Sequence, residues 1–344
     1  MKLTRITGIA AGLSLLVAGM QAQVSLPSVF TDHMVLQQKS EVPVWGWGSA
    51  SATIKVVGSW APLDTATTVV RSDGTWDTTL KTVGAGGPYT LSVLGDGTRE
   101  LKDVMLGEVW LCSGQSNMEW TPMHGIDNSE KEVAAANYPN IRFFHIPKRG
   151  AATPQNNCEA SWAPCTPDKM KSTSAIAYFF GRDLQKDLNV PVGLIVSAWG
   201  GTPAEVWVPE EQIMNNPRIR DVMPDKTYPW WPVEPGVLYN QMISPVVPYA
   251  LAGAIWYQGE SNRDHPDSYG ILLKTMVESW RKSFKKDFPF YLVQIAPFTY
   301  NAGDNGAALV REHQEWVART VPGAGMVAVS DCVADVKNIH PTDK

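Results

Sequence analysis

The sequence predicts an α/β protein in which helices flank a parallel sheet and a small β-sandwich precedes that sheet. The first observation behind this prediction is that short apolar runs alternate with helical patterns after residue 104. The second is that period-two alternation and frequent turn signals fill the stretch before it. The chain is also long enough for this arrangement. With 344 residues, of which 44% are hydrophobic and 18% charged, it can form one large and one small domain.

Residues 24–103 form the predicted β-rich N-terminal domain. Polar and apolar residues alternate over residues 53–56, 76–80 and 89–93, and glycine-rich turn signals separate these runs. Several short strands without a helical pattern are typical of an antiparallel β-sandwich. We expect this domain to have a packing or spacing role rather than a catalytic one.

Residues 104–344 form the second predicted domain. Strands are expected at residues 109–112, 141–145, 192–197, 252–257, 290–295 and 326–330. Helices are expected around residues 176–184, 269–280 and 306–319, because apolar residues recur there at spacings of three and four. Residues 207–245 are rich in proline and lack periodicity, so we expect a long excursion above the sheet that helps to shape a binding site.

The first 22 residues have the pattern of a signal peptide. Lys2 and Arg5 precede an apolar stretch at residues 6–17, and Ala22 offers a position for cleavage. The apolar stretch is too short to span a membrane comfortably. The sequence therefore predicts an exported protein, periplasmic or secreted, with no membrane span after cleavage.

Cysteine and charge patterns limit the expected partners and cofactors. In an oxidising compartment Cys158 and Cys165 could form a disulfide, whereas Cys112 and Cys332 are expected to be buried free thiols. The four cysteines lack metal-ligand spacing, so no metal site is expected. The net charge of −5, without any basic run, gives nucleic-acid binding no electrostatic support. The oligomeric state is not predicted.

The strand at residues 109–112 ends in the most informative segment of the chain, Ser113-Gly114-Gln115-Ser116-Asn117. Small residues let the backbone turn sharply and place the Ser116 hydroxyl at the carboxyl end of a buried strand, where ligands collect in open α/β sheets. With backbone N–H groups free around it, Ser116 is a candidate nucleophile beside an oxyanion hole. Taken alone, a serine-rich turn without function explains the segment equally well.

Three other segments follow predicted strands in the same way. Gly201 lets a backbone N–H approach a ligand without interference from a Cβ atom, although a structural turn explains it as well. Asn262 could donate to a developing oxyanion, although an isolated Asn is more often a helix cap. His340 is the one histidine of six on a loop after a sheet strand with acidic residues nearby, and it could act as base. His124 could line the site.

Together, the four segments resemble the four blocks of the SGNH hydrolase superfamily. Gly-Gln-Ser-Asn-Met, Trp-Gly-Gly-Thr-Pro, Trp-Tyr-Gln-Gly-Glu-Ser-Asn and Ile-His-Pro are similar to the sialate O-acetylesterase family, and the resemblance runs from residue 24 to the end. It implies a flavodoxin-like parallel sheet as the esterase domain. It also implies removal of acetyl groups from carbohydrate hydroxyls, typically in O-acetylated sialic acids, with no metal or organic cofactor.

The resemblance also implies roles for individual residues. Ser116 would be the nucleophile and His340 the general base. The N–H groups of Ser116 and Gly201 would form the oxyanion hole with the side chain of Asn262. The candidate substrate-binding residues lie in the same blocks: Gln115, Gln258 and Glu260.

The sequence departs from the family pattern before its histidine. Lys337 stands where the superfamily commonly has an aspartate, and Asn338 stands where members of this family often have one. The imidazole still needs an acceptor for its Nδ1–H. We expect that acceptor to be Asp335, with Asp331 or a backbone carbonyl near Asn338 as alternatives.

The sequence ends at Lys344, four residues after His340. A closing helix, and in many relatives a further β-rich region, are expected beyond this point. We therefore expect a sequence truncated at its carboxyl end and less stable than an extended version, with its activity open to question.

Three functions fit these residues. The first is an esterase acting on O-acetylated sialic acids, and the second is an acetylesterase acting on a plant polysaccharide such as acetylated xylan. The third is a non-catalytic carbohydrate-binding protein, which the 14 Trp residues and the β-rich N-terminal region favour. A sialic acid carries a carboxylate and favours a cationic partner, for which Arg142 and Arg263 are candidates, although either is more often a solvated surface residue.

Overall fold

The computed structural model describes residues 23–223, 227–301 and 303–344. The predicted signal peptide, residues 1–22, lies outside the described residues. No helix in the described ranges is long and apolar enough to cross a membrane.

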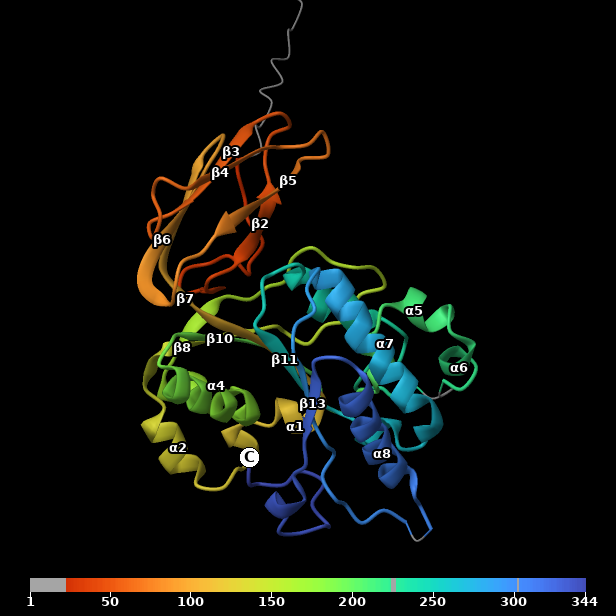
Figure 1. Cartoon of the computed structure of the whole chain (residues 1–344). Helices are drawn as coiled ribbons and strands as arrows, with labels where there is room; N and C mark the ends of the chain where they lie inside the picture. The colour runs from red at the N-terminus through yellow and green to blue at the C-terminus, as the bar shows by residue number, and fades with distance from the viewer. Residues whose placement is uncertain (1–22, 224–226, 302) are drawn as a thin grey trace, which may run out of the picture.

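Mainly antiparallel strands make up the N-terminal part, which lies at one end of the molecule (Figure 1), with β1 paired in parallel to β7. β4, β3, β6 and the first part of β7 form one sheet, and β2 pairs with β5 in another. Val44, Val56 and Val93 are buried in one cluster, which explains the period-two pattern of the sequence. The strands are β1 (Val35–Gln37), β2 (Glu41–Trp47), β3 (Thr53–Gly58), β4 (Thr65–Val69), β5 (Thr75–Lys81), β6 (Gly86–Leu94) and β7 (Thr98–Gly114).

β7 links the two parts of the molecule. Its first residues pair with β6, whereas residues 108–114 lie inside the central parallel sheet. Asp103 has a φ of +53°, so the strand changes direction between these two sections. The boundary predicted at residues 103 and 104 thus falls within one continuous strand, and the division into two domains stays a prediction.

The central sheet is largely parallel, as the sequence predicts. Its order is β13-β12-β11-β7-β10-β8-β9, and only β9 runs antiparallel to its neighbour. All six strands predicted after residue 104 are present; the one predicted at residues 109–112 is the last part of the much longer β7, and the ends of the others are shifted by a few residues. The strands are β8 (Tyr138–His145), β9 (Trp162–Cys165), β10 (Val192–Ala198), β11 (Gly253–Tyr257), β12 (Phe290–Val293) and β13 (Ala324–Val327).

Five strands of this sheet have the flavodoxin-like order that the resemblance implies. Numbered along the chain among themselves, β10, β7, β11, β12 and β13 lie in the order 2-1-3-4-5, and β8 is added beside β10. β10 is buried along its whole length and lies beside β7 in the middle of the sheet. β8 has exposed residues and lies one place nearer the edge, where a partly polar strand is tolerated.

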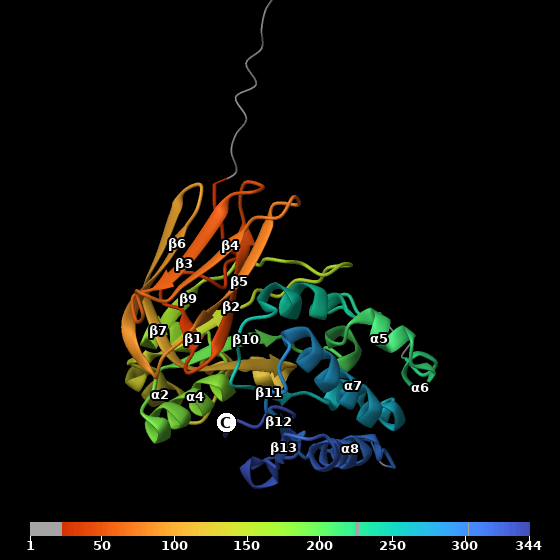
Figure 2. The same cartoon turned by 45° about the horizontal axis from the view of Figure 1, so that its top comes forward.

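Helices cover both faces of this sheet. Figures 1 and 2 show α2 and α4 on one side and α7 and α8 on the other. Leu111 of β7 packs in the same cluster as Trp280 of α7 and Val310 of α8, whereas Cys112 packs in the cluster of Tyr178 of α4. The helices are α1 (Ser116–Glu119), α2 (Ser129–Ala135), α3 (Pro167–Lys171), α4 (Ala175–Leu188), α5 (Glu210–Met214), α6 (Pro217–Arg220), α7 (Pro266–Phe284) and α8 (Gly306–Thr320).

The proline-rich stretch at residues 207–245 is not a single open loop. It contains α5, α6 and a π-helical turn at Tyr239–Ile243, and Ile213 and Ile219 are fully buried. These elements are too short to give a periodic pattern, which is why the sequence does not reveal them.

The disulfide considered from the sequence is not formed, because all four cysteines are free thiols. Cys158 packs in one core cluster with its Sγ 3.4 Å from Ser28 Oγ, whereas Cys165 packs in the other cluster. Cys112 is buried as expected. Cys332 is a free thiol as expected, but the prediction that it is buried is wrong, because it lies after the last strand and is partly exposed.

Candidate active site

Three strands of the sheet end at the same level. In the register of the sheet Gly114 of β7 pairs with Ala198 of β10 on one side and with Tyr257 of β11 on the other. The N–H of Trp199 donates to the carbonyl of Gly114 at 3.1 Å. The segments after these strands therefore leave the sheet side by side, at the edge where open α/β sheets hold ligands.

Ser116 is the first residue of α1 and stands directly above this edge. The turn before it requires a glycine, because a Cβ at Gly114 would lie 2.1 Å from the carbonyl oxygen of Tyr257. The N–H of Gln115 donates to that same oxygen at 3.0 Å. The sharp strand-to-helix turn is thus held by backbone contacts to β11 and exposes the Ser116 side chain.

His340 reaches Ser116 from the other end of the chain. Its Nε2 lies 2.9 Å from Ser116 Oγ, at hydrogen-bonding distance. The imidazole stacks on the Trp120 indole with the ring centroids 4.0 Å apart, which fixes the plane of the ring. Sequence reasoning did not single out Trp120, which lies one turn after Ser116.

The charge state of His340 suits a base. Burial is the main cause and the positive charge of Lys344 adds to it, and together they lower the pKa of His340 to about 4. The imidazole is therefore neutral at pH 7, and a neutral imidazole can accept the proton of a hydroxyl group. His124 contacts the same Trp120 indole in a tilted arrangement, with the ring centroids 4.9 Å apart.

Asn117 ties the His340 loop to the site. Its Nδ2 donates to Glu260 at 2.8 Å and to the carbonyl of Ile339 at 3.0 Å, and its Oδ1 accepts from Lys344 at 2.7 Å. Burial raises the pKa of the Glu260 carboxyl, although the bond from Asn117 opposes this shift. One buried amide thus positions the residue that precedes the histidine.

Neither Asp335 nor Asp331 forms a hydrogen bond with the imidazole of His340. Asp335 is exposed, and its carboxylate accepts from the N–H of Lys337 at 2.9 Å. Asp331 is exposed as well, and no described residue accepts a hydrogen bond from His340 Nδ1. Asn338 instead accepts from the backbone N–H of His340 at 3.0 Å, which shapes the loop but does not contact the ring.

Asn262 lies buried behind the edge, with its amide in a fixed orientation. Its Oδ1 accepts from the N–H of Ala204 at 2.9 Å and from Gln258 Nε2 at 2.7 Å. Because both partners are donors, this atom must be the oxygen, and the Nδ2 group donates to Glu205 at 2.9 Å. The second hydrogen of Nδ2 has no partner among the described residues and is free to donate to a ligand.

Sequence reasoning missed Glu205, the buried partner of this amide. It lies in the 3-10 helix Ala204–Trp207 and is 2% exposed. Burial raises the pKa of Glu205, and the hydrogen bond from Asn262 opposes that shift. A carboxylate among the apolar residues of this turn was the one available signal, and no spacing linked it to Asn262.

The loop after β10 packs against Ser116. A Cβ at Gly200 would lie 3.1 Å from the Cβ of Ser116, and the N–H of Gly200 donates to Glu119 at 2.5 Å. Gly201 has a φ of +79°, and a Cβ there would lie 2.5 Å from the Trp231 ring. The N–H of Gly201 makes no hydrogen bond within the described residues, so it is free for a ligand.

The polar groups of the candidate substrate-binding residues join the blocks to one another. Gln115 Oε1 accepts from the N–H groups of Gly259 and Ser261 at 3.2 and 3.3 Å. Gln258 bonds Asn262 and is completely buried. Glu260, which bonds Asn117, also lines a pocket beside Gly201. Among the residues that the structure describes, no group of three or more His, Cys, Asp or Glu side chains could hold a metal ion.

That pocket, of about 170 Å³, contains Arg263. Its guanidinium group pairs with Asp304 and lies over the Tyr300 ring, with Cζ 4.4 Å from the centroid. Arg142, in contrast, is 4% exposed and donates to both carboxylate oxygens of Asp103, at 2.7 and 3.2 Å. Arg142 therefore holds β8 to β7 and is not available to a ligand.

Known proteins share both the sequence and the fold. Residues 106–344 match the family described as carbohydrate esterase, sialic acid-specific acetylesterase. Sialate O-acetylesterase from Homo sapiens is 32% identical over 357 aligned positions, covering 92% of this chain and 67% of that protein. The enzyme of the same name from Mus musculus is 32% identical over 379 positions, covering 92% and 70%. A solved carbohydrate acetylesterase from Xanthomonas citri is 34% identical and superimposes with a TM-score of 0.81 over 93% of this chain and 71% of that one.

Proposed function

The chain belongs to the sialic acid-specific acetylesterase family of carbohydrate esterases, and we propose that it hydrolyses acetyl esters of O-acetylated sialic acids through an acetyl-serine intermediate. Like its relatives, it is a carboxylic ester hydrolase. The observation that carries the proposal is the 2.9 Å contact of Ser116 Oγ with His340 Nε2, beside two free N–H donors. In this proposal these groups act as the nucleophile, the neutral base and the oxyanion donors of ester hydrolysis.

The proposed reaction has two steps. His340 Nε2 takes the proton of Ser116 as Oγ bonds to the acetyl carbonyl carbon, and the resulting oxyanion accepts from the N–H groups of Ser116 and Gly201 and from Asn262 Nδ2. The bond to the sugar oxygen then breaks, and this oxygen takes the proton from His340. Water attacks the acetyl-serine in the second step, with His340 again as base, and releases acetate and free Ser116.

The first prediction concerns pH. Because His340 must be neutral to act as base and its pKa is lowered to about 4, kcat/KM should rise tenfold per pH unit below that value and stay level up to neutral pH. The measurement is a pH profile of kcat/KM with 4-nitrophenyl acetate on enzyme shown to be folded at each pH. A midpoint near 6.5, the ordinary value for histidine, would contradict the assigned environment of His340.

The second prediction concerns the acidic partner of the base. Asp335 is exposed and bonds a backbone N–H rather than the imidazole. Asp335→Asn should therefore keep kcat/KM within about threefold of wild type, whereas losing a carboxylate that truly orients a catalytic histidine costs about 10⁴-fold. Steady-state kinetics measure this effect. A fall of several hundredfold in kcat/KM would show that Asp335 orients His340.

The third prediction concerns the substrate. Arg263 is the arginine that lines the pocket beside Gly201, and a sialic acid carboxylate is a suitable partner for it. We expect a higher kcat/KM on O-acetylated sialic acid than on acetylated xylo-oligosaccharide. Arg263→Gln should raise KM for the sialic acid about tenfold, the usual loss for a hydrogen bond to a charged group, and leave 4-nitrophenyl acetate unaffected.

Arg218→Gln, at an exposed position on α6, is the matched control and should change neither KM. Faster turnover of the acetylated xylo-oligosaccharide would instead favour a plant-polysaccharide esterase. The mechanism would stand in that case, and only the substrate assignment would fail.

We also propose that the protein is exported, on the strength of the charged and apolar pattern in its first 22 residues. The mature protein should then begin at Gln23. N-terminal sequencing of the protein recovered outside the cytoplasm is the test, and an intact Met1 on active protein would contradict it.

A further inference from the structure

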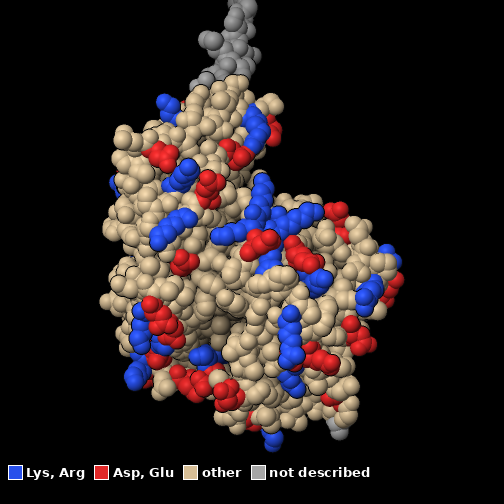
Figure 3. All heavy atoms as spheres, viewed as in Figure 1, with Lys and Arg blue, Asp and Glu red and all other residues tan. Residues whose placement is uncertain are grey.

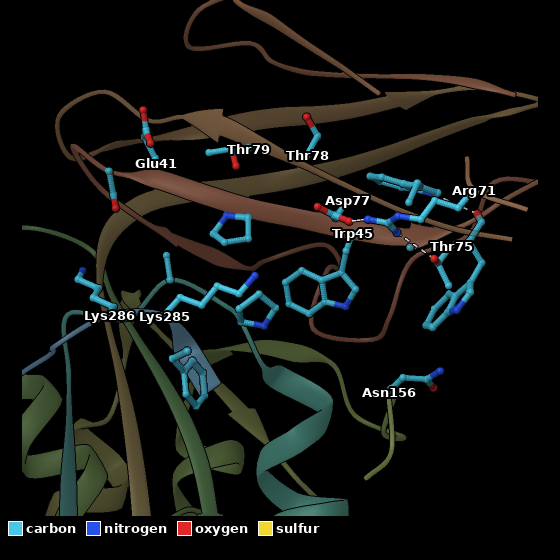
Figure 4. Close-up of a pocket in the computed structure, with 18 residues that line it drawn as sticks. Glu41, Trp45, Arg71, Thr75, Asp77, Thr78, Thr79, Asn156, Lys285 and Lys286 are labelled. Atoms are coloured by element: carbon cyan, nitrogen blue, oxygen red, sulfur yellow. Dashed lines mark hydrogen bonds and ion pairs between the residues drawn. The ribbon is translucent and has the colours of Figure 1, made fainter. Parts of the chain in front are cut away.

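A second cleft lies at the opposite end of the parallel strands from Ser116. Its volume is about 520 Å³, and it opens between the sheet of β2 and β5 and the carboxyl end of α7 (Figure 4). Ala250 and Lys286 line it, and these residues precede β11 and β12, whereas Ser116 follows β7. The length of β11, about 17 Å, therefore separates the cleft from the active site.

The floor of the cleft is an aromatic surface with polar neighbours. Alternate residues of β2, among them Trp45 and Trp47, face the cleft and remain partly exposed. In the register of the sheet Trp45 pairs with Asp77 and Trp47 with Thr75. Phe30 meets the Trp45 ring edge-on at a centroid distance of 4.7 Å, which holds the indole in place.

The opposite wall is a rigid turn that carries two lysines. Lys285 ends α7 in the left-handed conformation, and Lys286 donates to the carbonyl of Leu251 at 2.7 Å. Arg281 fixes the turn from behind, because it donates to the carbonyls of Phe288 and Pro322 at 2.9 and 2.8 Å. The ammonium group of Lys285 has no described partner and points into the cleft (Figure 4).

The charge balance at this wall is positive. Arg71 and Asp77 pair with each other on the floor, so their charges cancel. Glu41 adds one negative charge to the lining against the positive charges of Lys285 and Lys286. Lys282, Lys285 and Lys286 remain at the end of α7, and Figure 3 shows Lys and Arg side chains gathered in the notch below the N-terminal strands. An anion entering the cleft would meet this cationic side.

We propose that this cleft is a second binding site for an anionic sugar residue of an oligosaccharide chain. The sugar ring would stack on the Trp45 indole, its carboxylate would pair with Lys285, and its hydroxyl groups would bond polar side chains such as Thr79 and Asn156. A partly exposed, fixed indole opposite an unpaired ammonium group, in a cleft that hydroxyl and amide side chains also line, matches the two faces of such a sugar. The choice of ligand rests on the proposed function, and the site would hold a distal part of a long glycan substrate.

The test uses the full chain and unacetylated oligosialic acid, which the esterase cannot turn over. Calorimetric titration at low salt should give tighter binding of oligosialic acid than of a neutral oligosaccharide of equal length. Trp45→Ala should weaken binding about tenfold, as loss of a central aromatic anchor does. Lys285→Gln should weaken it about two- to fivefold and reduce its dependence on salt.

Matched controls are Trp316→Ala on α8 and Lys131→Gln on α2, both at exposed positions and both expected to bind as wild type. All four variants should hydrolyse 4-nitrophenyl acetate at the wild-type rate. Because Lys285 is exposed, Lys285→Gln should fold normally, and its binding affinity tests the proposal even if Trp45→Ala does not fold.

Wild-type affinity in both cleft variants would overturn the proposal, and equal affinity for the neutral oligosaccharide would overturn its anionic character. Failure of the proposed function is separate, because it would appear as no acetate release from acetylated sialic acid while binding at the cleft persists.

Discussion

Ser116→Ala should lower kcat for 4-nitrophenyl acetate by about 10⁴-fold or more, because no other hydroxyl can replace the nucleophile that contacts His340. His340→Ala should cause a loss of similar size, since the hydroxyl then has no base. The double variant should be no slower than either single variant, because groups that act as one unit do not contribute additively. Steady-state and single-turnover kinetics on the three variants measure this.

Ser113→Ala is the matched control for the nucleophile. Ser113 lies in the same strand end, is fully buried, and its Oγ has no hydrogen-bond partner. Its replacement should leave kcat within about twofold of wild type, as expected where no interaction is removed. If Ser116→Ala kept the turnover of this control, the reaction could not proceed through Ser116.

Asn262→Ala should lower kcat about 10²–10³-fold with little change in KM, since the amide N–H acts on charge that develops only in the transition state. The structure supports this size of effect because both heavy atoms of the amide are held: Oδ1 by Ala204 and Gln258, and Nδ2 by Glu205. An amide held in this way needs no reorganisation when the oxyanion forms. The measurement is kcat and KM for the variant, with thermal unfolding as a check on the fold.

Glu205→Gln separates orientation from donation. A glutamine oxygen can still accept from Asn262 Nδ2, so the amide keeps its direction and kcat should fall less than about tenfold. If Asn262→Ala kept kcat within threefold of wild type and unfolded at the same temperature, Asn262 would not be a donor of the oxyanion hole.

The sheet and its main helices could be predicted because each has a strong local pattern. β7 and β10 contain apolar runs of strand length, and α7 repeats apolar residues at helical spacing. The order of the five core strands agrees with the family resemblance, whereas the place of β8 beside β10 could not be predicted, because it depends on contacts across the folded sheet. The continuity of β7 through the predicted boundary is likewise a tertiary feature.

The residues of the site likewise fall into those that the sequence predicts and those that it does not. Ser116 could be proposed because it comes directly after a strand, and His340 because it lies on the loop that follows the last strand, and both carry reactive groups. Glu205 and Trp120 could not, because their roles arise from contacts across the fold rather than from any spacing in the chain. Asp335 was expected from its position near the histidine, yet the loop turns its carboxylate to the N–H of Lys337.

The acetyl-enzyme itself tests the central claim most directly. Enzyme mixed with 4-nitrophenyl acetate and quenched in acid within the first turnovers can be digested and analysed by peptide mass spectrometry. The mechanism predicts one acetyl group, located on Ser116 and absent from the Ser116→Ala variant. Turnover at the wild-type rate with no acetyl group on Ser116, or with the label on another residue, would contradict it.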